Sequence, residues 1–126
     1  LVPGEQYAVS LYARSNVSVP HDLTIEWFKD DSYAERANNS GTTGVMSGTP
    51  DSSWTYFKGT VVVPSDATAM RLTFYAFSDG TTNDYVDIDA VMITKGKTVY
   101  SFADGNTENW AWTGTPNNST SIGPAP

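Results

Sequence analysis

The feature that most constrains the fold is a two-residue alternation of apolar and polar side chains, which recurs in short stretches along the chain. It is clearest in residues 6–14, 23–29 and 69–78. Side chains two apart on a β-strand point to the same face, so each stretch predicts a strand with one face in a core. Turn-forming residues separate such stretches about every 8 to 12 residues, as expected for a β-sandwich of about seven or eight strands. The sequence therefore predicts an all-β fold of two antiparallel sheets.

The alternation also predicts which side chains are buried. Trp54 opens a further stretch, residues 54–63, and is expected in the core because tryptophan buries a large apolar area. Gly59 interrupts that stretch, where we expect a bulge or close packing. The inward rows are expected to contain Tyr7, Val9, Leu11 and Ala13; Leu23, Ile25 and Trp27; Phe57, Val61 and Val63; and Met70, Leu72, Phe74 and Ala76.

The pattern is weakest in residues 30–53, which are rich in Asn, Ser, Thr and Gly. There we expect a mobile loop, with at most short strands near residues 33–36 and 45–46. Towards the C-terminus, residues 98–102 predict another strand. Trp110 and Trp112 share a face of the following stretch, residues 109–115.

The chain of 126 residues is long enough for one domain with one sizeable core. We expect this domain to cover residues 1–122, with residues 123–126 as a linker or frayed end. Because the chain begins at Leu1 without a methionine, we interpret it as part of a longer protein.

The charge and composition exclude several classes of function. A net charge of −7 argues against binding to nucleic acid or to an anionic membrane surface, since both require a basic face. The chain has no cysteine, so a disulfide framework and a thiolate zinc site are both absent. No apolar run approaches the roughly 20 residues of a membrane span. Neutral ligands, or a cation, remain compatible with this composition.

The sequence gives little support for an enzyme. The single histidine, His21, lies beside Asp22 in a loop and is expected to be solvated at the surface. No nucleophile motif or phosphate-binding loop accompanies it. Fourteen acidic residues could supply the two carboxylates of a glycoside hydrolase, but they lie in turns or in one strand and offer little cleft. We therefore expect no catalytic activity.

Two carboxylates interrupt the apolar run of residues 86–94. Asp87 and Asp89 are two apart, so on a strand they share one face. A carboxylate in a buried strand is costly unless it is paired, hydrogen-bonded or metal-bound. Compensation by a metal, by backbone N–H groups or by a cation is therefore expected at this strand.

Aromatic and charged side chains occupy the faces that the alternation leaves outside the core. Sugar rings pack their C–H faces on aromatic planes, and their hydroxyls bind planar polar groups. If the strands share a sheet, these side chains form one saccharide-binding patch; alternatively, a neighbouring domain covers them. The candidate ligand-binding residues are Tyr12, Arg14, Glu26, Phe28, Tyr75 and Phe77.

An ordered set of short motifs resembles the carbohydrate-binding modules of families 4, 9 and 22. It comprises Pro3-Gly4-x-x-Tyr7-x-x-Ser10-x-Tyr12, Trp54 before a strand closed by Pro64, and Val86-Asp87-Ile88-Asp89-Ala90-Val91. The resemblance covers about residues 1–96 and implies a jelly roll that binds glycans on a concave sheet. It also implies a structural calcium, with Asp89 as a ligand and Asp104 in place of a family glutamate. Among the aromatic candidates it favours Tyr75 and Phe77.

The C-terminal segment is similar to the endings of related modules in bacteriophage tail and baseplate proteins. This similarity rests on Tyr100-x-Phe102-x-Asp104-Gly105-x-Thr107 and on the run Trp112-Thr113-Gly114-Thr115-Pro116-Asn117-Asn118-Ser119-Thr120-Ser121. It implies a location in the virion tail or outside the cell. The implied partners are cell-wall polysaccharide and neighbouring domains of a larger chain.

One departure from the family pattern leaves two hypotheses open. The strand with which family 4 and 9 modules begin should precede Leu1 and is absent, while a similar motif with Phe102 and Trp110 occurs near the C-terminus. Either residues 99–115 fill the vacant strand position in a permuted fold, or the chain is a fragment cut near a module boundary.

The sequence thus predicts a non-catalytic carbohydrate-binding module that serves in host adhesion. The alternative is a structural or protein-interaction β-sandwich of a larger tail or secreted protein. An accessory module of a glycoside hydrolase is less favoured.

Overall fold

The computed structural model describes residues 1–37, 41–80 and 82–123, and within these ranges the chain forms β-strands and no helix. The strands are β1 (Gln6–Ser15), β2 (His21–Phe28), β3 (Thr42–Gly48), β4 (Thr55–Val62), β5 (Ala69–Tyr75), β6 (Val86–Lys95), β7 (Ala111–Trp112) and β8 (Ser121–Ile122).

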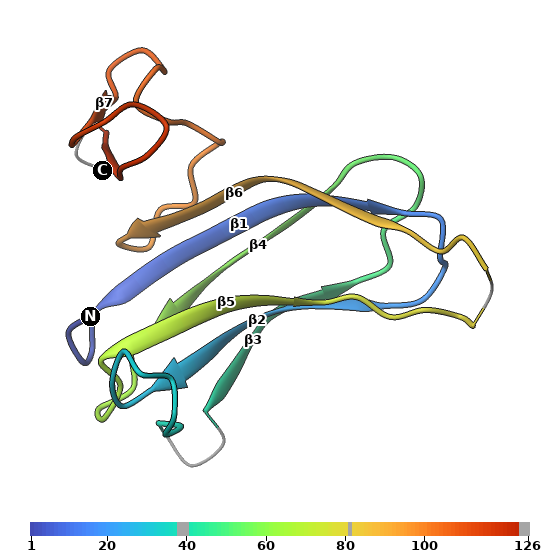
Figure 1. Ribbon diagram of the computed structural model, residues 1–126, viewed down its shortest axis with the longest axis horizontal. Coiled ribbons are helices and arrows are strands. Elements are labelled where there is room, and N and C mark those ends of the chain that lie inside the picture. The colour runs from blue at the N-terminus through green and yellow to red at the C-terminus, as the bar shows by residue number, and fades with distance from the viewer. Residues whose placement is uncertain (38–40, 81, 124–126) are drawn as a thin grey trace.

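Two antiparallel sheets of three strands face each other across the core (Figure 1). One has the order β4-β1-β6 and the other β3-β2-β5. The prediction of an all-β sandwich of two antiparallel sheets is confirmed. The jelly-roll label stays a prediction.

The core contains the inward rows that the alternation predicts, except that Ala76, expected inward, lies beyond β5 and is exposed. Val9, Leu11, Leu23, Ile25, Trp27 and Phe57 are all buried in one cluster, on which Met70, Leu72 and Phe74 pack from β5. The indole Nε1 of Trp27 donates a hydrogen bond of 2.8 Å to Thr43 Oγ1, which satisfies the polar atom of this buried ring. Each such large side chain contributes about 1.5–3 kcal/mol when it leaves water.

The two sheets meet closely at the β3–β4 edge. Gly59 pairs with Val9 in a regular β1–β4 ladder, so no bulge occurs there. A Cβ atom at Gly59 would lie only 2.6 Å from Val45 Cγ1, so close packing is the feature that requires glycine. A register shift occurs instead in the β1–β6 ladder, near Ala90, whose φ is +54°.

The opposite edge of the sandwich, between β5 and β6, is open. Ile88 pairs with Ala13 and Ile93 with Val9, so both isoleucines lie on the core side of their sheet. They are nevertheless 45% and 40% exposed, whereas their partners are fully buried. Both β5 and β6 are edge strands, since each forms a ladder with one neighbour. An apolar row of β6 therefore lies at the surface.

A small C-terminal lobe, residues 98–123, lies over the β4-β1-β6 sheet (Figure 1). Its strands β7 and β8 pair with each other, and Tyr56 Oη donates a hydrogen bond of 3.0 Å to the carbonyl of Tyr100 from the sheet below. Residues 98–102 form no strand, and residues 99–115 pair with neither main sheet. The predicted strand there and the permuted arrangement are both wrong, because this segment folds on its own turns and tryptophans.

Three local predictions are corrected. The stretch expected to be a loop contains the seven-residue strand β3, because Val45 and Met46 pack against the core and Thr43 accepts the hydrogen bond of Trp27. Trp54 is not buried but 42% exposed. His21 is not solvated but fully buried, with its ring edge-on to Phe74 at 5.8 Å. The expected turn at residues 38–40 lies outside the described residues.

Candidate functional site

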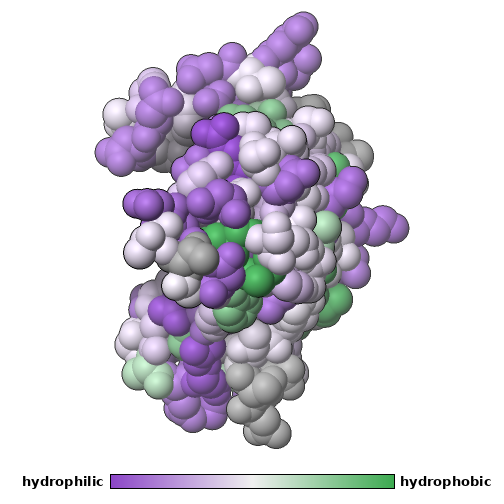
Figure 2. Space-filling view, turned by 90° about the vertical axis from the view of Figure 1, so that its right-hand side faces the viewer, coloured by the Kyte–Doolittle hydropathy of each residue, from purple (hydrophilic) through white to green (hydrophobic). Residues whose placement is uncertain are grey.

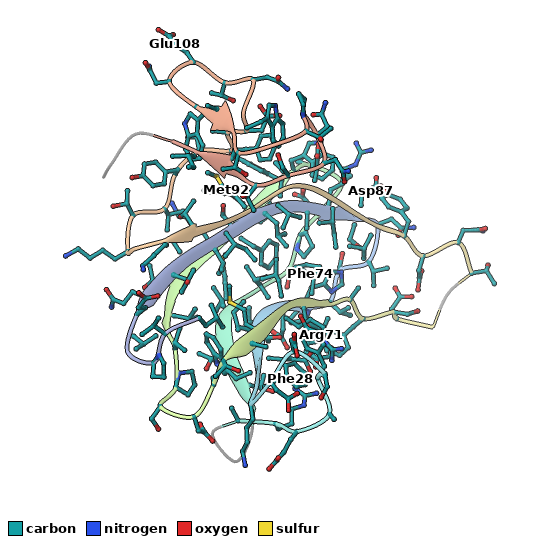
Figure 3. All side chains as sticks on the ribbon, turned by 60° about the vertical axis from the view of Figure 1, so that its left-hand side comes forward. Phe28, Arg71, Phe74, Asp87, Met92 and Glu108 are labelled. Atoms are coloured by element: carbon teal, nitrogen blue, oxygen red, sulfur yellow. The ribbon has the colours of Figure 1, made fainter. Side chains whose placement is uncertain are left out.

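The six predicted ligand contacts do not form one patch, because their strands belong to different sheets. Tyr12 and Arg14 project from the outer face of β4-β1-β6, whereas Glu26, Phe28 and Tyr75 lie on the β3-β2-β5 sheet. Figure 3 shows this separation, with Phe28 and Arg71 on one sheet and Asp87, the partner of Arg14, on the other. The single patch is therefore wrong, and two outer faces must be considered.

Phe77 lies beyond the end of β5. Its backbone N–H donates to His21 Nδ1 at 3.4 Å, and a pocket of 230 Å³ that it lines extends towards Val17 and Tyr85. Figure 2 looks onto this end of the sandwich and shows an apolar patch within a largely polar surface. Phe77 therefore closes the end of the core and does not extend the surface that contains Tyr75.

The outer face of β3-β2-β5, hereafter the β2 face, is defined by cross-strand register. Outward side chains form three successive rows, each with one residue from β3, β2 and β5. The rows are Ser47, Asp22 and Tyr75; Gly44, Thr24 and Thr73; and Thr42, Glu26 and Arg71.

The β3 side of the β2 face is hollowed into a groove of 460 Å³. The groove exists because the side chains of Thr24, Thr42 and Ser47 are small and Gly44 has none. A Cβ atom at Gly44 would meet nothing within 4 Å, so no neighbour fills the space above it. Asp22, Leu23, Val45 and Met46 line the groove beside these small residues.

A buried carboxylate organises the other end of the β2 face. The Glu26 side chain is 3% exposed and accepts hydrogen bonds of 2.6 Å from Arg71 Nε and 2.7 Å from Thr73 Oγ1. Arg36 Nη2 lies 2.6 Å from its second oxygen, and Tyr75 Oη is 3.4 Å away. The hydrogen bond from Arg71, followed by that from Thr73, lowers the pKa of Glu26 to about 2. This carboxylate is ionised and fully engaged with its neighbours.

Phe28 supports the two arginines from below. The guanidinium carbons of Arg36 and Arg71 lie 4.8 and 5.3 Å from the Phe28 ring centroid, and the Tyr33 ring is edge-on at 5.0 Å. Glu26 and Phe28 were expected to contact ligand, but both are 2% exposed. They position the groups above them.

The large exposed side chains of the β2 face are therefore two arginines and two tyrosines. The side chains of Arg36 and Arg71 are 42% and 53% exposed, and Tyr33 and Tyr75 are 48% and 42% exposed. Of these, only Tyr75 was among the predicted contacts. The alternation already placed Arg71 outward, while Arg36 and Tyr33 reach this face through the turn after β2, where the isolated bridge between Phe28 and Arg36 fixes the chain.

The opposite outer face contains a second aromatic group. Tyr12 stacks on Tyr56 with ring centroids 4.6 Å apart. Arg14 Nε donates to Asp87 Oδ2 at 2.8 Å, and the Arg14 guanidinium lies 4.8 Å from the ring centroid of Trp54. Arg14 is therefore held between a carboxylate and an indole, and it supplies the compensation that Asp87 requires.

The two predicted calcium ligands have local partners. Asp89 lies on the face of Asp87, as predicted, but it is exposed and accepts the backbone N–H of the adjacent Ala90 at 2.7 Å. Asp104 accepts the N–H of Asn106 at 2.9 Å and so closes a turn. In the part of the chain that the structure describes, no group of three or more acidic or histidine side chains could hold a metal. These donors do not fit the six to eight oxygen ligands of Ca²⁺, and the calcium site stays a prediction.

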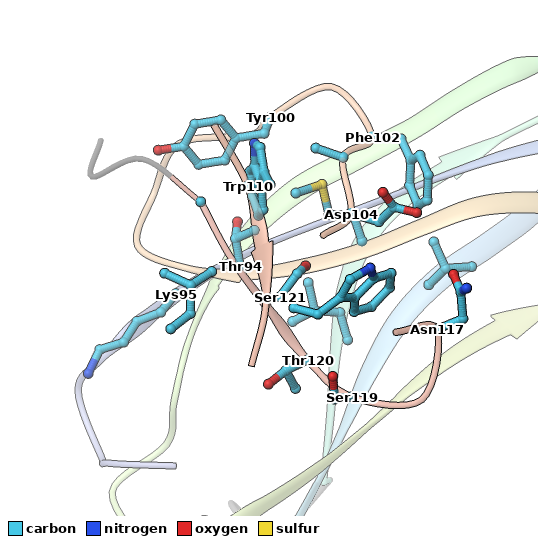
Figure 4. Close-up of a pocket in the computed structure, with 17 residues that line it drawn as sticks. Thr94, Lys95, Tyr100, Phe102, Asp104, Trp110, Asn117, Ser119, Thr120 and Ser121 are labelled. Carbon is cyan, nitrogen blue, oxygen red and sulfur yellow. The ribbon is translucent and has the colours of Figure 1, made fainter. Parts of the chain in front are cut away.

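A larger pocket of 660 Å³ separates β6 from the C-terminal lobe (Figure 4). Thr94 and Lys95 line it from β6, and Tyr100, Phe102 and Trp110 line it from the lobe. The lobe packs its indoles on glycine: a Cβ atom would come within 2.3 Å of Trp112 at Gly105 and within 2.4 Å of Trp110 at Gly123. Gly123, expected in a linker, is thus packed against the lobe.

Comparisons with known proteins give no further guide to function: no family model, no curated protein and no solved structure matches the chain. Among the residues described, no helix is long and apolar enough to cross a membrane. A functional assignment must therefore be argued from the chemistry of the outer faces.

Proposed function

We propose that this protein is a non-catalytic saccharide-binding module and that the β2 face is its binding surface. The observation that carries this proposal is the exposed Tyr75 ring beside two guanidinium groups already fixed by Glu26. An aromatic plane accepts the C–H face of a sugar ring, and forked N–H donors bind its oxygens. Both kinds of group are needed in a saccharide site.

The groove beside this cluster supports the same proposal. Three hydroxyl side chains, those of Thr24, Thr42 and Ser47, line it, and a hydroxyl group can both donate and accept hydrogen bonds, as sugar hydroxyls do. The arginine side chains lose little conformational entropy on binding, because Glu26 and Phe28 already hold them in place. A prepared, open face of this kind suits a neutral or weakly charged chain of sugars.

The state of Glu26 argues for binding without catalysis. Glycoside hydrolysis requires two carboxyl groups, one of which keeps its proton near neutral pH. The lowered pKa of Glu26 removes it as an acid, and its hydrogen bonds leave it no access to substrate. His21, the only histidine, is buried in the core.

The proposal extends to adhesion on cell-wall saccharides by a phage tail or another extracellular protein. Its support is the resemblance of residues 100–121 to endings of tail and baseplate modules. A single open face binds weakly, and several copies on one particle would raise the avidity by orders of magnitude.

Tyr75→Ala tests the proposal, with Phe77→Ala as a matched control. The two side chains are similarly exposed, at 42% and 48%, but only Tyr75 lies on the β2 face. In affinity gel electrophoresis against a panel of soluble polysaccharides, Tyr75→Ala should lose most of the retardation of the wild type, because the aromatic plane that receives the sugar ring is removed. Phe77→Ala should keep it.

Two results would count against the β2 face. Equal loss in both variants, with the fold of both retained by circular dichroism, would place the binding surface elsewhere than the β2 face. No retardation of the wild type by any saccharide would favour the alternative, a structural or protein-interaction domain in which Tyr75 and Tyr33 contact a neighbouring domain.

A further inference from the structure

The charges of the Glu26 cluster do not balance. One carboxylate, Glu26, faces two guanidinium groups, those of Arg36 and Arg71. Of the acids in the following turn, Glu35 pairs with Lys29 and Asp30 accepts hydrogen bonds from Ser32, and neither is an ion-pair partner of Arg36 or Arg71. The cluster of Glu26, Arg36 and Arg71 by itself therefore carries a formal charge of +1, although the chain as a whole carries −7.

The other acid of the β2 face is too distant to cancel this charge. Asp22 precedes Glu26 by four residues on β2, which places it about 13 Å away along the strand. That separation exceeds the Debye length of about 8 Å at physiological ionic strength. The β2 face thus has an acidic end at Asp22 and a cationic end at Arg71.

Arg71 also retains unused hydrogen-bond donors. It binds Glu26 through Nε, and within the described residues its two Nη nitrogens make no hydrogen bond. The hydrogen bond to Glu26 raises the pKa of Arg71, and smaller electrostatic contributions come from Tyr75 and Tyr33, so both phenols lie near the guanidinium. A rigid, exposed guanidinium edge matches a carboxylate better than it matches a hydroxyl.

The overall charge limits what kind of acid fits. A dense polyanion would be repelled by a chain of net charge −7, whereas a single carboxylate on a neutral glycan would meet the local positive charge. We infer that the β2 face selects saccharides with sparse carboxylate groups, such as isolated uronic acid residues, and places such a group against Arg71. This inference rests on the proposed function and narrows its ligand class.

The test compares one polysaccharide before and after removal of its charge. Glucuronoxylan and the same material after chemical reduction of its carboxyl groups to alcohols differ in the acid alone. In affinity gel electrophoresis, the wild type should bind the native polymer about tenfold more tightly than the reduced one, as expected for loss of a charged hydrogen bond. Arg71→Gln should bind both polymers with equal affinity, below that of the wild type for the native polymer.

Two further variants separate a specific contact from general charge and from misfolding. Lys58→Gln removes one positive charge from the opposite sheet and should keep the preference for the native polymer. Arg71→Lys keeps the charge beside Glu26 without the forked donors and should retain only part of the preference. Thermal unfolding of each variant identifies loss of fold.

The outcomes distinguish this inference from the proposed function. Equal binding of the native and reduced polymers by the wild type would overturn the acidic ligand class and leave saccharide binding in place. A preference that persists in Arg71→Gln would also overturn it. Binding to neither polymer, nor to any other saccharide of the panel, would overturn the proposed function itself.

Discussion

At the scale of single residues, Glu26 has the largest influence on the β2 face. A carboxylate buried in a sheet is costly unless several donors satisfy it, and here two arginines, a threonine and a tyrosine do so. The same bonds fix Arg71 and Arg36 in the geometry in which a ligand would meet them. Stability and binding are thus coupled through one side chain.

The lowered pKa of Glu26 predicts an acid-dependent loss of stability. Its pKa of about 2 in the folded chain lies below the ordinary value of 4.5. The unfolded state therefore binds the proton more tightly, so the stabilisation is complete above pH 4.5 and is lost as the pH falls towards 2. Urea unfolding across this range should show a decrease of about 1–2 kcal/mol from this group, allowing for the exposure of both arginines.

Glu26→Gln should flatten that part of the pH profile and lower the free energy of unfolding at pH 7. Glu35→Gln is the control, because it removes an exposed carboxylate from the adjoining turn. An unchanged acid profile in Glu26→Gln would contradict the role given to this residue.

At the scale of elements, two glycines at the β3–β4 edge of the sandwich have different functions. Gly59 of β4 leaves room for Val45 of β3, whereas Gly44 leaves the space above the sheet empty. Close packing thus holds the two sheets together at this edge, and the missing side chain at Gly44 shapes the groove.

Gly59→Ala and Gly44→Ala should therefore act in opposite ways. Gly59→Ala should lower the free energy of unfolding by about 1–3 kcal/mol, because its Cβ atom would overlap Val45. Gly44→Ala should leave stability equal or slightly higher. It should nevertheless weaken saccharide binding, since the added methyl group occupies the groove. Thermal unfolding and affinity gel electrophoresis measure the two effects, and equal stability of the two variants would refute the packing argument.

The elements also show what could be predicted from sequence. Period-two alternation identified the inward rows of β1, β2, β4 and β5, because burial on one face imposes that pattern. Alternation says nothing about which strands are neighbours, so it left open whether Tyr12 and Tyr75 share a sheet, and they lie on two. His21 and Trp54 were misplaced for the same reason: local pattern does not reveal what packs above a strand end.

The candidate site, like the fold, was predictable only in the features that parity along a single strand determines. Tyr75 and the outward position of Arg71 followed from parity, but the cluster around Glu26 depends on the register β2 adopts with β5 and on the turn that returns Arg36. These contacts join residues far apart in the sequence. Only the folded arrangement brings them together.

At the scale of the whole molecule, the β5–β6 edge distinguishes this sandwich from a closed one. Ile88, Val91 and Ile93 expose apolar surface along an edge strand whose backbone is paired on one side. Such edges tend to pair with other chains. The bulge near Ala90 and the charges of Asp87, Asp89 and Lys95 oppose that tendency without covering the apolar row.

Replacement of Ile93 by lysine should therefore reduce self-association. Sedimentation velocity at increasing protein concentration should show a smaller rise in mean mass for Ile93→Lys than for the wild type, since a charge on an edge strand opposes pairing. Val62→Lys, an exposed position on the other edge strand of the same sheet, is the matched control. An equal rise in all three proteins would show that this edge takes no part in association.

The open edge also affects how the stability of this protein should be measured. If chains associate through β6 in the folded state but not when unfolded, mass action makes the melting temperature rise with protein concentration. A single melting curve would then report contacts between molecules together with those inside one. Unfolding followed over a dilution series, and extrapolated to low concentration, gives the stability of the isolated sandwich.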